Sequence, residues 1–281
     1  MIISAFGDET ASDFAEQLRI LTDLHIRHID VRAAWDVNCS LFTDQQIARI
    51  QSLCQAQGVR VACMGSPIGK SPIDDDIRIE SERLKTIGAT AQALGTRNIR
   101  IFSFYPSGTH ASDALQQAIE RLGVLTEIAA QHDLQLLLEN EKGVVGDLPE
   151  RCLALMQALD SPHFRFIWDP ANFVQCGAAR QVDQWWDALH PYIGYIHIKD
   201  AKLPQSAHGE ERSQVTVAGG GDGQVALLLA RLRDWGYEGL LSLEPHLLEA
   251  RHSSGFSGAK GMAMAVAALR KLMREAGIAE R

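Results

Sequence analysis

Residues 134–139 read Leu-Gln-Leu-Leu-Leu-Glu, and residues 164–169 read Phe-Arg-Phe-Ile-Trp-Asp. Each stretch is a short, mostly apolar run that ends in a carboxylate. A run of this kind is typical of a parallel strand, because such a strand is buried on both faces and meets apolar neighbours on each. How often these runs recur along the chain therefore indicates the fold.

Eight such runs recur along the 281 residues: 2–6, 28–32, 59–64, 98–102, 134–139, 164–169, 193–198 and 240–244. Stretches with helical periodicity separate them, for example at Phe14, Leu18 and Leu21. This alternation predicts an α/β protein with a closed (β/α)8 TIM barrel, formed by residues 1–281 as a single domain. An open doubly wound sheet is the alternative. It usually carries a glycine-rich fingerprint after its first strand, and residues 4–8 lack one.

Local signals mark several helix ends. Thr43 with Gln46, and Asp147 with Glu150, match the capping-box pattern and predict helix starts. Gly58 and Gly95 stand where two helices are expected to end.

Composition excludes several classes of protein. Hydrophobic residues make up 46% and charged residues 22%, which excludes a disordered or fibrous chain. The net charge of −8 argues against nucleic acid and anionic membranes as partners. Apolar runs fall short of the roughly 18–20 residues of a membrane span, and residues 1–4 lack the basic start of a signal peptide. Five scattered cysteines without a CxxC pair indicate reduced thiols and a cytoplasmic protein.

Polar residues end the last four predicted strands: Glu139, Asp169, His197 and Glu244. Because the carboxyl ends of barrel strands share one rim, these four side chains are expected to meet. Three adjacent carboxylates repel one another, and a divalent cation removes that cost. Their oxygen and nitrogen donors suit Mn²⁺, the ion expected first, and also Mg²⁺, Co²⁺ or Zn²⁺. Taken singly, each residue could instead be a solvated strand end or a helix cap.

Four segments carry a resemblance to a known family: 137–141 (Leu-Leu-Glu-Asn-Glu), 168–173 (Trp-Asp-Pro-Ala-Asn-Phe), 195–200 (Tyr-Ile-His-Ile-Lys-Asp) and 242–246 (Ser-Leu-Glu-Pro-His). The chain resembles the xylose-isomerase-like TIM-barrel superfamily of sugar isomerases and epimerases. Its members include ketose 3-epimerases, inosose isomerases, hydroxypyruvate isomerases and, more distantly, endonuclease IV.

The resemblance implies roles for particular residues. Glu139, Asp169, His197 and Glu244 match the family's metal ligands, and Glu139 and Glu244 match the acid/base pair of ketose epimerases. The resemblance also implies a homo-oligomer. Three features depart from the family pattern. Asn172 and Tyr195 stand where many members have histidine, and the basic residue that usually follows His197 by about six is Lys202 at five, with Arg212 further on. These departures concern the orientation of substrate hydroxyls rather than the metal.

Other polar residues near the same rim are candidate substrate-binding residues: Arg32, Lys70, Lys142, Asn172, Lys199, Asp200 and His246. The glycine-rich stretch 219–223, Gly-Gly-Gly-Asp-Gly, is interpreted as a turn in which Asp222 caps the next helix. A phosphate-binding or substrate-covering loop is the alternative, because barrels often bind phosphate after strand seven.

The expected function is a metal-dependent isomerase or epimerase of a small keto-sugar or sugar derivative. A cation polarises a carbonyl, and two glutamates exchange protons with the adjacent carbon through an enediolate. Loss of a β-hydroxyl instead would make the enzyme a lyase of the dehydroshikimate or inosose dehydratase type. An endonuclease IV-like phosphodiesterase and a non-catalytic binding barrel are the remaining alternatives.

Overall fold

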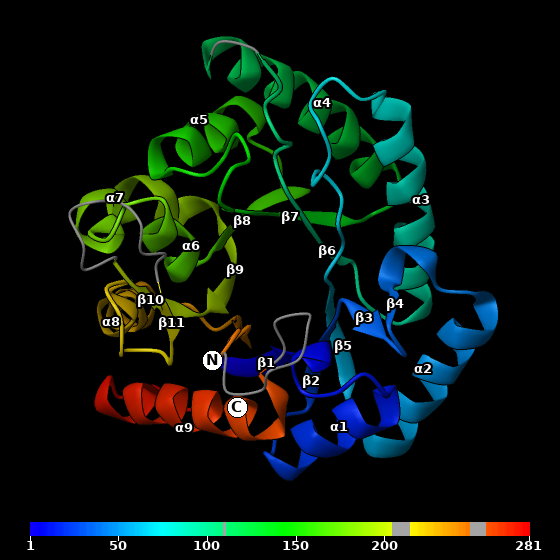
Figure 1. Ribbon diagram of the computed structural model, residues 1–281, viewed down its shortest axis with the longest axis vertical. Helices are drawn as coiled ribbons and strands as arrows, with labels where there is room; N and C mark the ends of the chain where they lie inside the picture. The colour runs from blue at the N-terminus through cyan, green and yellow to red at the C-terminus, as the bar shows by residue number, and fades with distance from the viewer. Residues whose placement is uncertain (109–110, 204–213, 248–256) are drawn as a thin grey trace.

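The computed structural model describes residues 1–108, 111–203, 214–247 and 257–281. It contains a closed barrel of eight parallel strands in the order β1-β12-β9-β8-β7-β6-β5-β2. The strands form the central ring in Figure 1, and the helices surround it. Closure between β1 and β12 confirms the predicted TIM barrel and excludes the open doubly wound sheet.

The barrel strands are β1 (Ile2–Phe6), β2 (His28–Val31), β5 (Arg60–Met64), β6 (Asn98–Ile101), β7 (Gln135–Glu139), β8 (Phe164–Trp168), β9 (Ile193–Ile198) and β12 (Leu240–Leu243). Each predicted strand is present, with ends that agree within one residue. The agreement follows from burial, since the strands are buried over almost their whole length.

The α-helices are α1 (Phe14–Asp23), α2 (Asp44–Gln57), α3 (Ile77–Ala93), α4 (Ala111–Gln131), α5 (Pro149–Leu159), α6 (Pro170–Gln175), α7 (Gln181–Leu189), α8 (Val225–Trp235) and α9 (Gly258–Glu275). Short 3-10 helices are η1 (Gly7–Glu9), η2 (Cys39–Leu41) and η3 (His190–Tyr192). Two small hairpins pair β3 (Ala33–Ala34) with β4 (Val37–Asn38) and β10 (Asp200–Lys202) with β11 (Gln214–Thr216). In the part of the chain described, no helix has the length and apolar character needed to cross a bilayer.

Local capping signals were a mixed guide to helix starts. The Thr43–Gln46 capping box is confirmed, and Gly58 ends α2 in the left-handed conformation with φ of 64°. The Asp147–Glu150 prediction is wrong. Helix α5 begins at Pro149 after Leu148, and Asp147 instead accepts a hydrogen bond from Arg151 at 2.7 Å. Proline suits the first helical turn because it has no N–H to satisfy there, so it sets the start of α5.

A buried polar network joins four strands inside the barrel, one layer below the rim. The Asp30 carboxylate accepts hydrogen bonds from the Tyr195 hydroxyl at 2.7 Å and the Ser242 hydroxyl at 2.5 Å. Ser4 Oγ lies 3.0 Å from the Tyr195 hydroxyl. Burial raises the pKa of Asp30, and the two hydroxyl donors oppose that rise. The Tyr195 ring packs edge-on against His197, so this layer supports the rim above it.

The hydroxyl of Tyr195 should contribute measurably to stability. We expect Tyr195→Phe to lower the free energy of unfolding by about 1–3 kcal/mol, because the buried Asp30 carboxylate loses a hydrogen-bond donor. Urea denaturation followed by circular dichroism measures the change. Tyr105→Phe is the matched control, because Tyr105 is exposed. Equal stabilities of the two variants would contradict the role assigned to the network.

Candidate metal centre and pocket

Four side chains converge at the carboxyl ends of β7, β8, β9 and β12. Glu139, Asp169, His197 and Glu244 are buried, and each offers a ligand atom within 4.8 Å of the others. His197 Nδ1 lies 3.0 Å from Glu139 Oε1, 3.8 Å from Asp169 Oδ2 and 3.7 Å from Glu244 Oε2. The geometry therefore assembles the set that the strand ends predicted.

Asp169 uses one oxygen for the fold and presents the other to the cluster. Its Oδ1 accepts the backbone N–H of Asn172 at 2.9 Å and so caps α6. The Asn140 side chain bonds the backbone of Asp169 twice, at 2.9 Å through both its amide nitrogen and its oxygen. These contacts fix β7 and β8 together at the rim, and they leave Asp169 Oδ2 facing the other ligand atoms.

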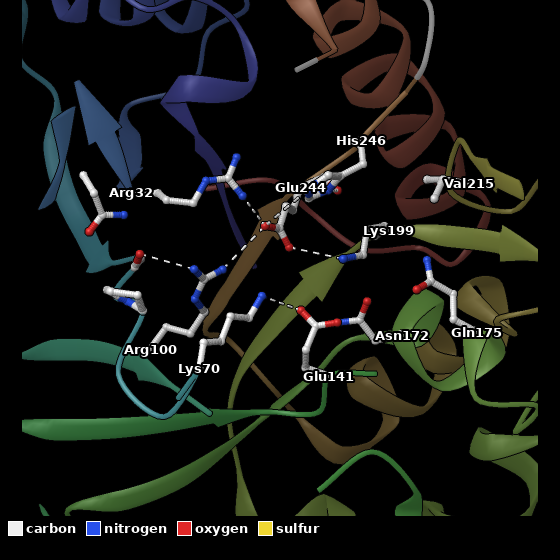
Figure 2. Close-up of a pocket in the computed structure, with 13 residues that line it drawn as sticks. Arg32, Lys70, Arg100, Glu141, Asn172, Gln175, Lys199, Val215, Glu244 and His246 are labelled. Atoms are coloured by element: carbon white, nitrogen blue, oxygen red, sulfur yellow. Dashed lines mark hydrogen bonds and ion pairs between the residues drawn. The ribbon is translucent and has the colours of Figure 1, made fainter. Parts of the chain in front are cut away.

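The two oxygens of Glu244 likewise contact different cationic side chains. Its Oε1 accepts a hydrogen bond from Arg32 at 2.6 Å and lies 3.5 Å from Arg100, while its Oε2 lies 3.3 Å from Lys199 Nζ. Figure 2 shows Arg32, Arg100 and Lys199 converging on Glu244 from three directions. Arg100 also lies 3.3 Å from Glu139 Oε2, so one guanidinium contacts both candidate acid/base glutamates.

Unsatisfied atoms and charge both fit a divalent cation. Among the described residues, no donor forms a well-aligned hydrogen bond with Glu139 Oε2 or Asp169 Oδ2, although both are buried. Apart from the contacts of His197 and His246, the ion pairs around the pocket involve six carboxylates and four lysine or arginine side chains. These groups are Asp8, Glu9, Glu139, Glu141, Asp169 and Glu244, against Arg32, Lys70, Arg100 and Lys199. Carboxylates therefore outnumber the lysines and arginines here, and a bound divalent cation would offset part of this negative charge.

The ligand carboxylates differ in how they are neutralised. Burial raises the pKa of Asp169 to about 7, with Lys199 opposing and Glu139 and Glu244 adding to the rise. Burial acts in the same direction on Glu139, but His197 and Arg100 outweigh it and lower the pKa of Glu139 to about 2. Lys199, His246 and the two arginines likewise hold the pKa of Glu244 well below its ordinary value. Asp169 is therefore the ligand least compensated by the protein itself.

Above the cluster lies a cavity of about 350 Å³, a volume that suits a small metabolite. Five of the predicted substrate-binding residues line it: Arg32, Lys70, Asn172, Lys199 and His246. Arg100, Glu141, Gln175 and Asn38 also line it, and the sequence reasoning did not propose them. An arginine in the middle of the buried run 98–102 was the one available signal for Arg100.

Two predicted substrate-binding residues lie elsewhere. Lys142 is exposed and does not line the cavity. Asp200 accepts hydrogen bonds from the backbone N–H groups of Ala201, Gly219, Gly221 and Gly223, all at 2.9–3.0 Å. Its carboxylate therefore occupies the glycine-rich loop as an internal anion, and burial raises its pKa against those four donors.

The role predicted for Asp222 is wrong. Its Oδ2 accepts the backbone N–H of Leu203 at 2.7 Å, and Gln224 is the residue before α8. The glycine-rich stretch is a turn, as expected. The carboxylate that binds its backbone amides is Asp200 of β10, and not a residue within the stretch.

A family model described as "Xylose isomerase-like TIM barrel" matches residues 18–274. The chain belongs to this family. Two solved structures share its fold. One is the IOLI protein with a zinc atom, at a TM-score of 0.77 and 15% identity over 98% of both chains. The other is a D-tagatose 3-epimerase-like protein, at a TM-score of 0.75 and 15% identity over 99% of this chain and 98% of the other.

The sequence is also similar to a curated protein, a 3-dehydroshikimate dehydratase of Bacillus anthracis. It is 25% identical over 178 residues, which are 63% of this chain. The match spans 60% of the relative's own length. This xylose isomerase-like barrel is thus similar to proteins named for epimerisation and for dehydration.

Metal binding should depend on pH through Asp169. We expect Mn²⁺ to raise the melting temperature by more at about pH 8 than at about pH 5.5, because below a pKa near 7 the ion must displace a proton from Asp169. Differential scanning fluorimetry with and without Mn²⁺ measures both shifts. Asp169→Asn should lose the shift, whereas Asp187→Asn, at an exposed position, should keep it. Equal shifts at the two pH values would contradict this assignment.

Proposed function

We propose that this protein is a divalent-metal-dependent isomerase or epimerase of a small keto-sugar or sugar derivative. The observation that carries the proposal is the buried cluster of Glu139, Asp169, His197 and Glu244 beneath a 350 Å³ polar cavity. Similarity to a D-tagatose 3-epimerase-like protein supports the same class of reaction.

The four clustered residues would hold the cation, which would supply Lewis acidity toward a substrate carbonyl and so acidify the neighbouring C–H bond. Glu139 and Glu244 come from β7 and β12, which β8 and β9 separate in the barrel wall. Glu244 also lines the cavity, and in the proposed reaction the two glutamates would exchange protons with opposite faces of one carbon. Lys199, His246, Arg32 and Arg100 lower the pKa of Glu244 and keep it ionised, so that it accepts a proton rather than arriving already protonated.

A second candidate is a lyase that removes water after the same proton abstraction. Two observations favour it. The cavity is lined by Arg32, Lys70, Arg100 and Lys199, which suit a substrate that carries a carboxylate, and the chain is similar to a 3-dehydroshikimate dehydratase. In this reaction the proton leaves one carbon and a hydroxyl leaves the next, so no proton has to return to carbon.

An isotope experiment separates the two. The protein is incubated with Mn²⁺ in D₂O and a panel of ketoses, inososes and 3-dehydroshikimate, and the products are read by NMR. Deuterium beside the carbonyl of an isomerised or epimerised product supports the proposed function. New alkene or aromatic signals support the lyase. Absence of any exchange across the panel, with Mn²⁺ shown to be bound, would argue for a non-catalytic barrel.

Glu244 should be essential to turnover. We expect Glu244→Gln to lower kcat by about 10²–10⁴-fold, because the amide neither accepts the proton nor offers an anionic ligand. Steady-state kinetics on the substrate identified by NMR measures the loss. Glu141→Gln is the matched control. Glu141 lines the same cavity but pairs with Lys70 at 2.7 Å, outside the ligand cluster, so its loss should cost less than about tenfold. Wild-type rates for Glu244→Gln would remove it from catalysis.

A further inference from the structure

Lys199 stands beside two carboxylate oxygens of the candidate metal centre, one from Asp169 and one from Glu244. Its Nζ lies 3.0 Å from Asp169 Oδ2 and 3.3 Å from Glu244 Oε2. Both oxygens also face His197 Nδ1, at 3.8 and 3.7 Å. Figure 2 shows the lysine reaching Glu244 from the side opposite Arg32 and Arg100.

The lysine has little freedom to leave this position for water. It follows His197 by two residues at the end of β9, so the alternation of the strand turns both side chains toward the barrel axis. Lys199 is only 7% exposed. Burial lowers the pKa of its ammonium, but the surrounding carboxylates outweigh that effect and raise the pKa. A protonated ammonium is thus held within the carboxylate cluster.

We infer that Lys199 is the internal counter-ion of the metal centre, which neutralises Asp169 and Glu244 when no cation is bound and competes with the cation for the same two oxygens. The inference rests on the proposed metal site. It assigns Lys199 a positioning role that sets metal affinity, because an ammonium and a divalent cation that share two carboxylate oxygens repel each other.

Two consequences follow for the protein without metal. The three buried ligand carboxylates would otherwise repel one another, and the ammonium offsets that repulsion, so the barrel keeps its rim before the ion arrives. When the ion binds, Lys199 loses its partners and turns its donors toward the cavity that it already lines. Ion binding and the presentation of Lys199 to substrate are then coupled.

Metal affinity tests the inference without any substrate. We expect Lys199→Met, a neutral side chain of similar length, to bind Mn²⁺ at least about tenfold more tightly than wild type, as followed by the EPR signal of free Mn²⁺. The metal-free variant should also melt at a lower temperature, so the shift caused by Mn²⁺ should grow. Lys199→Gln serves as a second variant if the methionine variant does not fold without the ion.

Lys70→Met is the matched control, because Lys70 lines the same cavity but pairs with Glu141 rather than with a ligand carboxylate. Its affinity for Mn²⁺ should equal that of wild type within about twofold. Unchanged or weaker binding in both Lys199 variants would overturn the inference and show that the lysine supports the ligands from outside. Failure of the wild-type protein to bind Mn²⁺ would instead overturn the metal site and with it the proposed function.

Discussion

Mutual repulsion among three buried carboxylates is the constraint on which the upper end of this barrel depends. Glu139, Asp169 and Glu244 are drawn together because β7, β8 and β12 are parallel strands of one closed barrel whose carboxyl ends share one rim. Burial makes their charge costly unless cations offset it, and Arg32, Arg100 and Lys199 are the cations that the chain supplies. These three cationic side chains, which offset the charge of the carboxylates, also line the pocket above the cluster.

In Asp169 and Glu244, one carboxylate oxygen contacts supporting groups of the fold and the other faces the cluster. Asp169 caps a helix with Oδ1 and faces the cluster with Oδ2. Glu244 meets the arginines with Oε1 and faces Lys199 and His197 with Oε2. Each ligand is thereby oriented before any ion or substrate binds, which limits the reorganisation that binding requires.

The fold was predictable from the sequence because its main signal is local. A parallel strand buried on both faces is a continuous apolar run, and a run that ends in a charged residue marks the rim, so the strands and the four clustered residues follow from the chain alone. Asp200 shows where local reasoning ends. Alternation beyond β9 points Lys199 inward and Asp200 away from the cavity, but only the folded chain shows that residues 219–223 return to bind it. Arg100 was missed for the same reason, since its partners lie on β7 and β12, far away in sequence.

The loop organised by Asp200 bears on whether this barrel offers a binding site for a phosphoryl group. In barrels of this architecture, amide groups after the seventh strand commonly cradle a phosphoryl group. Here those amides are saturated by a carboxylate from the same chain, and its negative charge repels any second anion. A phosphoryl group would find these backbone amides already occupied by the Asp200 carboxylate.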